Sequence, residues 1–222
     1  MKINNFDLLC KNEGHEIAIL MMHGYGANKE DLAPLADVFK EFPITWYFPD
    51  APEIVFQTLF GAGRAWFPID MAKLERAYSA HDHDLFYESM PENFDEVANN
   101  INEVLLELQK KHQNVIVGGF SQGSMMSVEL SLRNDNANDL LLLSSAMIKK
   151  SQWQDKISKK NFGNVFQSHG REDNVLPFEL GQTLSDQLKD HCANYTFETF
   201  TGGHEIPNKV LQKVAEYFSL FT

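Results

Sequence analysis

The sequence predicts an α/β fold in which a mainly parallel sheet is covered by helices on both faces. Short apolar runs alternate with amphipathic stretches along most of the chain, which is the pattern of repeated strand–helix units. Several runs are apolar throughout, as expected of strands buried on both faces. The predicted strands cover 16–22, 44–48, 115–117, 140–143, 162–167 and 195–200. With 222 residues, 43% of them hydrophobic, the chain is predicted to form a single domain, 1–222.

Helices are predicted between these strands at 29–40, 91–112, 177–190 and 207–221, and another follows Ser121. The longest, 91–112, has apolar residues at spacings of three and four, with acidic residues on the other face. Its apolar positions are Phe94, Val97, Ile101, Val104, Leu105 and Leu108.

Composition excludes some classes of function. A formal net charge of −12 argues against nucleic acid as a partner and disfavours anionic substrates and anionic membranes. Two cysteines, Cys10 and Cys192, lie near opposite ends of the chain and favour a reducing compartment over a disulfide framework. No stretch approaches the roughly 18 apolar residues of a membrane span, and the N-terminus lacks the apolar core of a signal peptide. We therefore expect a cytoplasmic protein, peripheral at a membrane at most.

A candidate nucleophile lies in the pentapeptide Gly119-Phe120-Ser121-Gln122-Gly123, which matches G-x-S-x-G between a predicted strand and a predicted helix. On such a sharp turn the serine projects from the backbone, and the two glycines are small because strand and helix crowd together there. The helix N-terminus offers free N–H groups to a developing oxyanion. An ordinary glycine-rich turn is the alternative.

A nucleophilic serine needs a base within hydrogen-bond reach, and three histidines follow Ser121 in the chain. His204 lies in a glycine-containing loop directly after the last predicted strand, at the sheet edge where catalytic groups gather. His191 belongs to a charged helix end, and His169 precedes the candidate acid rather than following it. His204 is therefore the predicted base, with a surface or capping role as the alternative.

The predicted acid is Asp173, which follows the strand at 162–167 as His204 follows the last strand. Its neighbour Glu172 is the competing carboxylate, and a plain turn or capping role for Asp173 is the other alternative. Two backbone N–H groups are predicted to form the oxyanion hole, those of Gln122 and of Tyr25. Tyr25 belongs to the glycine loop, residues 23–28, which follows the first predicted strand. The side chain of His23 is expected to be structural.

The segment 53–91 has no clean periodicity and is predicted to be a lid or binding loop. Large apolar residues in it are predicted to line the mouth of an acyl site, with Gly61 and Gly63 allowing it to open. The predicted substrate-binding residues are Phe56, Leu59, Phe60, Trp66 and Leu176. The stretch 54–69 is also the candidate for transient contact with a membrane surface. A permanently packed edge strand is the alternative.

Six motifs together resemble the acyl-protein thioesterase, lysophospholipase and small carboxylesterase group of serine α/β-hydrolases. They occur in order over nearly the whole chain: HGYGAN, PDAP, RAWF, GGFSQGS, HGREDNVLP and GGHEIP. The resemblance implies an α/β-hydrolase fold, a triad of Ser121, Asp173 and His204, and backbone donors at Tyr25 and Gln122. It also implies an ester or thioester substrate. We expect no cofactor.

The chain departs from the family pattern at three places: Ser124 where another glycine is usual, Tyr25 where an aliphatic residue is usual, and an insertion at 71–91. None touches the triad, but each bears on substrate choice. The predicted function is hydrolysis of short to medium carboxylic esters through an acyl-enzyme intermediate.

Three alternatives stay open. The first is a lysophospholipase or acyl-protein thioesterase acting on long-chain lipid or S-acyl substrates, and the second is a non-catalytic hydrolase-fold binding protein. The third is a metal enzyme using the stretch HDHD at 81–84, which we expect instead to be a solvated loop without metal. The oligomeric state is open, a homodimer included.

Overall fold

A computed structural model of the chain describes residues 1–59, 61–69 and 90–222. Within these ranges an eight-stranded sheet has the order β1-β2-β4-β3-β7-β8-β9-β10. Neighbouring strands from β4 to β10 are parallel, whereas β1 and β2 pair antiparallel at one edge. The strands are β1 (Lys2–Ile3), β2 (Phe6–Lys11), β3 (Ile17–Met22), β4 (Ile44–Pro49), β7 (Asn114–Phe120), β8 (Leu140–Leu143), β9 (Phe162–Gly170) and β10 (Cys192–Phe200). The predicted mainly parallel sheet is confirmed.

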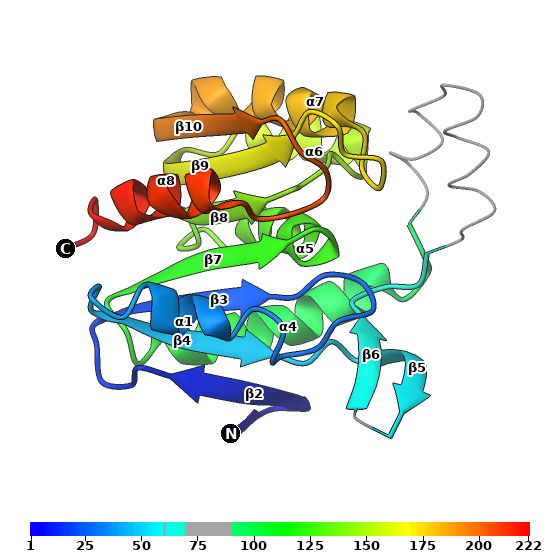
Figure 1. Ribbon diagram of the computed structural model, residues 1–222, viewed down its shortest axis with the longest axis vertical. Helices are drawn as coiled ribbons and strands as arrows, with labels where there is room; N and C mark the ends of the chain where they lie inside the picture. Colours follow the sequence, from blue (N-terminus) through cyan, green and yellow to red (C-terminus); the bar gives the residue numbers. More distant parts are fainter. Residues whose placement is uncertain (60, 70–89) are drawn as a thin grey trace.

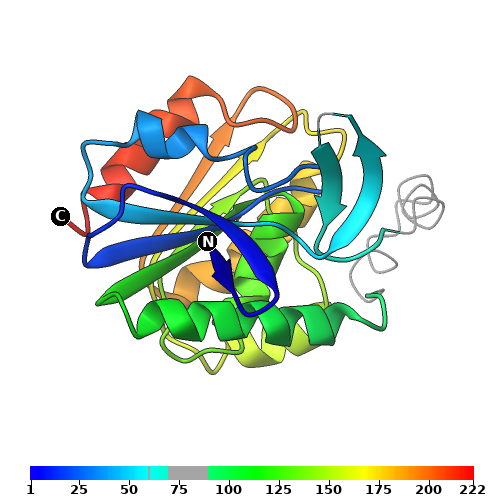
Figure 2. The ribbon, with the colours of Figure 1, turned by 90° about the horizontal axis from the view of Figure 1, so that it is seen from below.

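Helices cover both faces of this sheet (Figures 1 and 2). Two of them, α1 (Pro34–Val38) and α8 (Asn208–Phe218), lie on one face. The other face carries α4 (Phe94–Gln109), α5 (Gln122–Ser131), α6 (Lys150–Ile157) and α7 (Phe178–Leu188), the last of which runs into a short 3₁₀ turn, η1 (Lys189–His191).

Each face of the sheet has its own apolar core, because successive residues of a strand point to opposite faces. In β3, Leu20 and Met22 pack into the core beneath α4 to α7, whereas Met21 packs beneath α1 and α8. The same alternation holds in β7, where Val117 and Ile116 belong to different cores. This double burial explains why the central strands are apolar without interruption.

Three predictions from the sequence were incomplete or wrong. The helix predicted over 29–40 is only Pro34–Val38, because Pro34 lacks an N–H and fits only a first helical turn. The edge strands β1 and β2 were not predicted, since only Phe6 and Leu8 of β2 are fully buried and the apolar signal is short. Helix α6 was missed because Trp153 and Ile157 are its only buried residues.

The segment after β4 is more regular than its sequence indicates. Strands β5 (Glu53–Thr58) and β6 (Gly61–Ala65) form an antiparallel hairpin beside the main sheet (Figure 1). Strand β6 forms a bridge to the loop after β3, in which Arg64 pairs with Ala27. The prediction of an irregular segment over 53–91 is therefore corrected for 53–65, while the part at 70–89 lies outside the described residues.

Candidate active site

Ser121 lies where β7 ends and α5 begins, in a backbone conformation that non-glycine residues rarely adopt (φ 55°, ψ −121°). Its N–H donates to the carbonyl of Leu143 (2.9 Å), which extends the ladder with β8 by one residue. Its own carbonyl already accepts the N–H groups of Ser124 and Met125 at the start of the helix. The chain therefore reverses direction at Ser121 itself, as the G-x-S-x-G prediction requires.

The two glycines of the pentapeptide are required by close packing. A Cβ on Gly119 would lie 2.3 Å from the carbonyl carbon of Gly123, and a Cβ on Gly123 would lie 2.1 Å from the carbonyl oxygen of Met22. Strand, helix and the end of β3 thus meet at distances that no side chain allows.

Ser124 is one of the three places where the chain departs from the family pattern, and it lies inside the turn rather than in the site. Its side chain is fully buried, and its hydroxyl donates to the carbonyl of Ser121 at 2.6 Å. The Ser124 side chain therefore supports the backbone of the turn and has no surface that a substrate could contact.

His204 and Asp173 form a direct pair, with 2.7 Å between Nδ1 of His204 and Oδ2 of Asp173. Because a carboxylate only accepts, Nδ1 carries the proton, which leaves Nε2 able to accept one. The other oxygen of Asp173 accepts the N–H groups of Val175 (2.9 Å) and Leu176 (2.8 Å). Burial alone would raise the pKa of Asp173, but the hydrogen bonds from His204 and Leu176 outweigh it and lower the pKa below its ordinary value.

The loops that carry this pair are joined by their backbones. The N–H of Arg171 donates to the carbonyl of Phe200, and the N–H of Glu172 donates to that of Gly202 (2.8 and 2.9 Å). Gly170 must lack a side chain, because its Cβ would lie 2.2 Å from the carbonyl oxygen of Gly203. The parallel pairing of β9 with β10 therefore continues into the loops and brings Asp173 next to His204.

His204 also lies close to the serine turn, because its ring centroid is 4.8 Å from that of Phe120, the residue before Ser121. The competing carboxylate, Glu172, is exposed. His191 lies in η1, away from these loops.

His169 has a structural part in the site that its position in the sequence did not reveal. Its ring is fully buried, and Nε2 lies 2.8 Å from the carbonyl oxygen of Leu176 and 3.5 Å from Oδ2 of Asp173. Burial lowers the pKa of His169, so the ring is neutral and donates from Nε2. His169 therefore supports the turn at 173–176 from the buried side. The feature of the sequence that could have indicated this role is that His169 belongs to the HGREDNVLP motif.

The predicted oxyanion-hole donors come from two turns that approach each other. Gln122 is the first residue of α5, so its N–H has no partner within the helix. Within the described chain, the N–H of Tyr25 makes no backbone hydrogen bond. The glycine loop lies against the serine, because a Cβ on Gly24 would be 3.4 Å from Cβ of Ser121.

His23 is structural, as expected. Its Nδ1 donates to the carbonyl of Gly24 (2.8 Å), and its Nε2 accepts the N–H of Ala51 (3.1 Å). Burial lowers the pKa of His23, which agrees with a neutral ring that donates at one nitrogen and accepts at the other.

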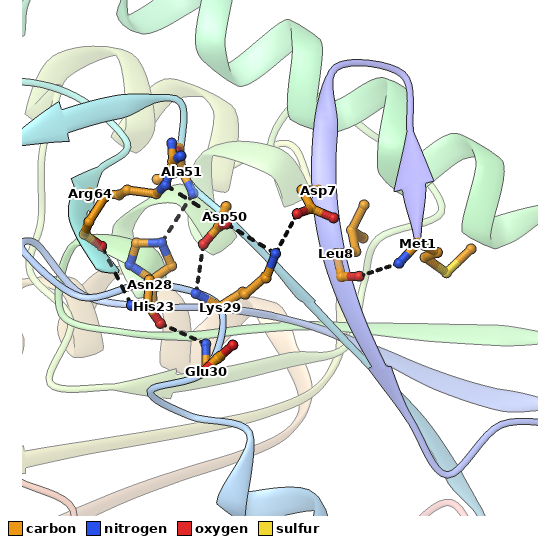
Figure 3. Close-up of polar contacts among 11 residues, drawn as sticks. Met1, Asp7, Leu8, His23, Asn28, Lys29, Glu30, Asp50, Ala51 and Arg64 are labelled. Atoms are coloured by element: carbon orange, nitrogen blue, oxygen red, sulfur yellow. Dashed lines mark hydrogen bonds and ion pairs between the residues drawn. The ribbon is translucent and has the colours of Figure 1, made fainter. Parts of the chain in front are cut away.

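The far end of the glycine loop is held by the polar contacts that Figure 3 shows. The N–H of Lys29 donates to Asp50 (2.9 Å), and its ammonium lies between Asp50 and Asp7. Arg64 of β6 donates from its side chain to the carbonyl of Ala51 (2.9 Å). The loop is thus tied to β2, to the end of β4 and to the hairpin.

Trp66 does not belong to an exposed mouth, so its predicted place in the substrate-binding set is corrected. It is fully buried, and its indole N–H donates to the carbonyl of His23 (2.9 Å). The side chain of Gln122 accepts the N–H of Trp66 (2.8 Å) and donates to the carbonyl of Phe67 (2.7 Å). Leu176 is also largely buried, at 5% exposure, and its contact with substrate stays a prediction.

The outer part of the hairpin does expose apolar side chains. Leu59 is 99% exposed and Phe56 is 51% exposed, with Ile54 and Val55 beside them. The ring of Phe56 lies next to the glycine loop, 3.6 Å from where a Cβ on Gly26 would be. Phe60, the remaining predicted substrate-binding residue, lies outside the described residues.

A cavity of about 420 Å³ lies at the base of the hairpin, apart from the candidate site. Its lining includes the polar side chains of Asp7, Asp50, Arg64 and Asn93, but none of the three predicted catalytic residues. Its polarity makes it unsuitable for an acyl chain.

The described ranges hold no group of three or more His, Cys, Asp or Glu residues placed to bind a metal ion, and HDHD at 81–84 lies outside them. Among residues 1–59, 61–69 and 90–222, no helix has the length and apolar character needed to cross a membrane.

The chain is similar to known proteins over nearly its whole length. Acyl-protein thioesterase 1 of Candida albicans is similar over 230 residues at 25% identity, covering 98% of this chain and 97% of that protein. The protein of the same name from Saccharomyces cerevisiae is 26% identical over 231 residues, covering 97% of each chain. The crystal structure of esterase PE8 has the same fold, with a TM-score of 0.76 at 22% identity over 98% of both chains.

The family model described as phospholipase/carboxylesterase matches residues 3–222, nearly the entire chain. The chain therefore belongs to the phospholipase/carboxylesterase family, an esterase and thioesterase family of serine hydrolases.

Proposed function

We propose that the protein hydrolyses carboxylic esters of short to medium acyl chains, with Ser121 as nucleophile, His204 as general base and Asp173 as the group that orients His204. The observation that carries this proposal is the 2.7 Å contact between His204 and Asp173, on loops beside the strained turn of Ser121. A charged, buried Asp173 holds the imidazole in the tautomer whose Nε2 can accept the serine proton.

In the proposed reaction, Oγ of Ser121 attacks the ester carbonyl carbon while Nε2 of His204 takes the hydroxyl proton. The N–H groups of Tyr25 and Gln122 stabilise the tetrahedral oxyanion. Collapse of this intermediate breaks the ester bond, and His204 gives its proton to the departing alcohol. A water molecule, deprotonated by His204, then attacks the acyl-enzyme, and the acid leaves as Ser121 regains its proton.

A second candidate, cleavage of long-chain lipid esters or S-acyl groups, is favoured by the exposed hairpin tip. Phe56 lies beside the glycine loop and Leu59 is fully exposed, so the tip can cover an acyl chain or contact a membrane surface. Relatives named acyl-protein thioesterase 1 support the same candidate. The net charge of −12 favours a zwitterionic over an anionic surface.

A cytoplasmic location is part of the proposal, supported by two cysteines that form no disulfide.

Two experiments test the proposal. Labelling with a fluorophosphonate followed by peptide mapping should modify Ser121 once, and Ser121→Ala should lose on the order of 10⁴-fold or more in turnover. The exposed Ser158→Ala provides the control, with wild-type rates expected. Rates on matched esters and thioesters of increasing acyl length then separate the two candidates. Full activity of Ser121→Ala would refute both.

A further inference from the structure

Trp66 connects the two backbone segments that supply the proposed oxyanion-hole donors. On one side, the side chain of Gln122 makes two hydrogen bonds to the backbone of 66–67, accepting from the N–H of Trp66 (2.8 Å) and donating to the carbonyl of Phe67 (2.7 Å). These bonds fix the start of α5 against the chain that leaves β6.

On the other side, the indole N–H of Trp66 donates to the carbonyl of His23 at 2.9 Å. Tyr25, the second proposed donor, follows two residues later, so the position of its N–H depends on where the His23 peptide is held. The imidazole of His23 is in turn fixed by Gly24 and Ala51. One residue, Trp66, therefore contacts both donor segments, through its backbone N–H on the Gln122 side and its indole N–H on the His23 side.

The side chain of Trp66 is packed inside the core. It is fully buried, with ring centroids 5.5 Å from His23 and 6.3 Å from Phe6. The preceding strand is also bound to the glycine loop, since the N–H of Gly26 donates to the carbonyl of Arg64 (2.7 Å) and the N–H of Arg64 to that of Ala27 (2.8 Å). Loss of the indole N–H would leave the buried carbonyl of His23 without this partner.

We infer that Trp66 is a positioning residue of the oxyanion hole, which sets the N–H of Tyr25 relative to the N–H of Gln122 and does not contact the substrate. The inference rests on the proposed function, in which these two groups stabilise the oxyanion. An oxyanion hole works through donors placed in advance at the transition-state oxygen, and displacements of about 1 Å are costly. The indole hydrogen bond is therefore expected to matter more in the transition state than in the ground state.

The test is Trp66→Phe, together with replacement of Trp66 by benzothienylalanine, which keeps the bicyclic shape but has sulfur in place of the N–H. Active sites are counted by fluorophosphonate titration, so that unfolded protein does not enter the rates. We expect kcat per active site to fall roughly tenfold to a hundredfold with KM nearly unchanged. Affinity for a trifluoromethyl ketone, which forms a tetrahedral adduct with a nucleophilic serine, should fall in the same proportion.

Trp46→Phe is the matched control. Trp46 is equally buried, but its indole N–H finds no hydrogen-bond partner among the described residues. The same substitution there removes similar volume without breaking such a bond, so kcat per active site should stay at the wild-type value.

Three outcomes would overturn the inference. They are wild-type kcat and ketone affinity in both Trp66 replacements, a raised KM with unchanged kcat, or a loss confined to the number of active sites. Failure of the proposed function would be distinct, because the wild-type enzyme would then form no adduct at Ser121 with either reagent.

Discussion

The loops after β9 and β10 and the β5–β6 hairpin all lie at the end of the sheet to which the parallel strands point (Figure 1). They are nevertheless built in opposite ways. In the loops, Asp173 is buried with both oxygens bonded, and the two backbones are hydrogen-bonded to each other. In the hairpin tip, Phe56 and Leu59 expose apolar surface. In the proposed function, this difference means that the reacting groups are fixed before the substrate arrives, whereas the apolar tip is covered only when an acyl chain or a membrane surface binds to it.

The largest expected effect comes from removing the charge of Asp173, the buried carboxylate shared by the two loops. Asp173→Asn keeps the shape of the side chain but no longer orients and stabilises the protonated ring of His204. We expect kcat to fall by about 10³- to 10⁴-fold. Glu172→Gln is the matched control, because this neighbouring carboxylate is exposed, and steady-state rates should remain near wild type. Equal losses in the two variants would contradict the assignment of the acid.

The same pair of variants tests the electrostatic part of the account. Since the folded-state pKa of Asp173 is lowered, its carboxylate stabilises the fold above the unfolded pKa of about 3.9. This contribution is lost as the pH falls through the lower folded-state pKa. The difference in unfolding free energy between wild type and Asp173→Asn should therefore shrink below about pH 4, as urea denaturation at several pH values would measure. A difference independent of pH would contradict the lowered pKa.

His169 offers a smaller perturbation of the same loops. His169→Leu removes the donor to the buried carbonyl of Leu176, which should destabilise the protein by about 1–3 kcal/mol and lower kcat roughly tenfold. His169→Gln carries an N–H near the same place and should restore part of both. If the glutamine variant is no better than the leucine variant, the hydrogen bond is not what holds the turn at 173–176.

The hairpin tip should respond differently from the loops. Leu59→Ser alters a side chain that is 99% exposed, so thermal stability and the rate on a short ester should not change. If the tip covers long acyl chains, their kcat/KM should fall about tenfold to a hundredfold, since burying a leucine contributes about 1.5–3 kcal/mol. Leu220→Ser, an exposed leucine near the C-terminus, is the control. Equal rates at every chain length would remove the tip from the acyl site.

Much of the fold was predictable because the central strands are buried on both faces and therefore carry unbroken apolar runs. The parts that were missed have weaker signals: β2 lies at the sheet edge with few buried residues, and α6 buries only two side chains. The hairpin was taken for an irregular segment because β5 is exposed along its whole length and shows no alternation.

The candidate site also has parts that could be predicted from the sequence and parts that could not. Ser121, Asp173 and His204 were predictable because each follows a recognisable strand and the carboxyl ends of parallel strands meet at one edge. The contacts of Trp66 were not predictable, since its hydrogen bonds reach residues 43 and 56 positions away and leave no pattern in the sequence. Apolar character alone placed Trp66 wrongly in an exposed mouth, when its side chain lies in the core.

The most direct test of the central claim is to trap the covalent intermediate. The enzyme would be mixed with an activated short-chain ester, quenched in acid within the first turnovers and mapped by mass spectrometry. The account predicts one acyl group per molecule, carried by the peptide that contains Ser121, and its absence in Ser121→Ala. An acyl group on another residue, or rapid turnover with no acylated enzyme and no burst of released alcohol, would contradict it.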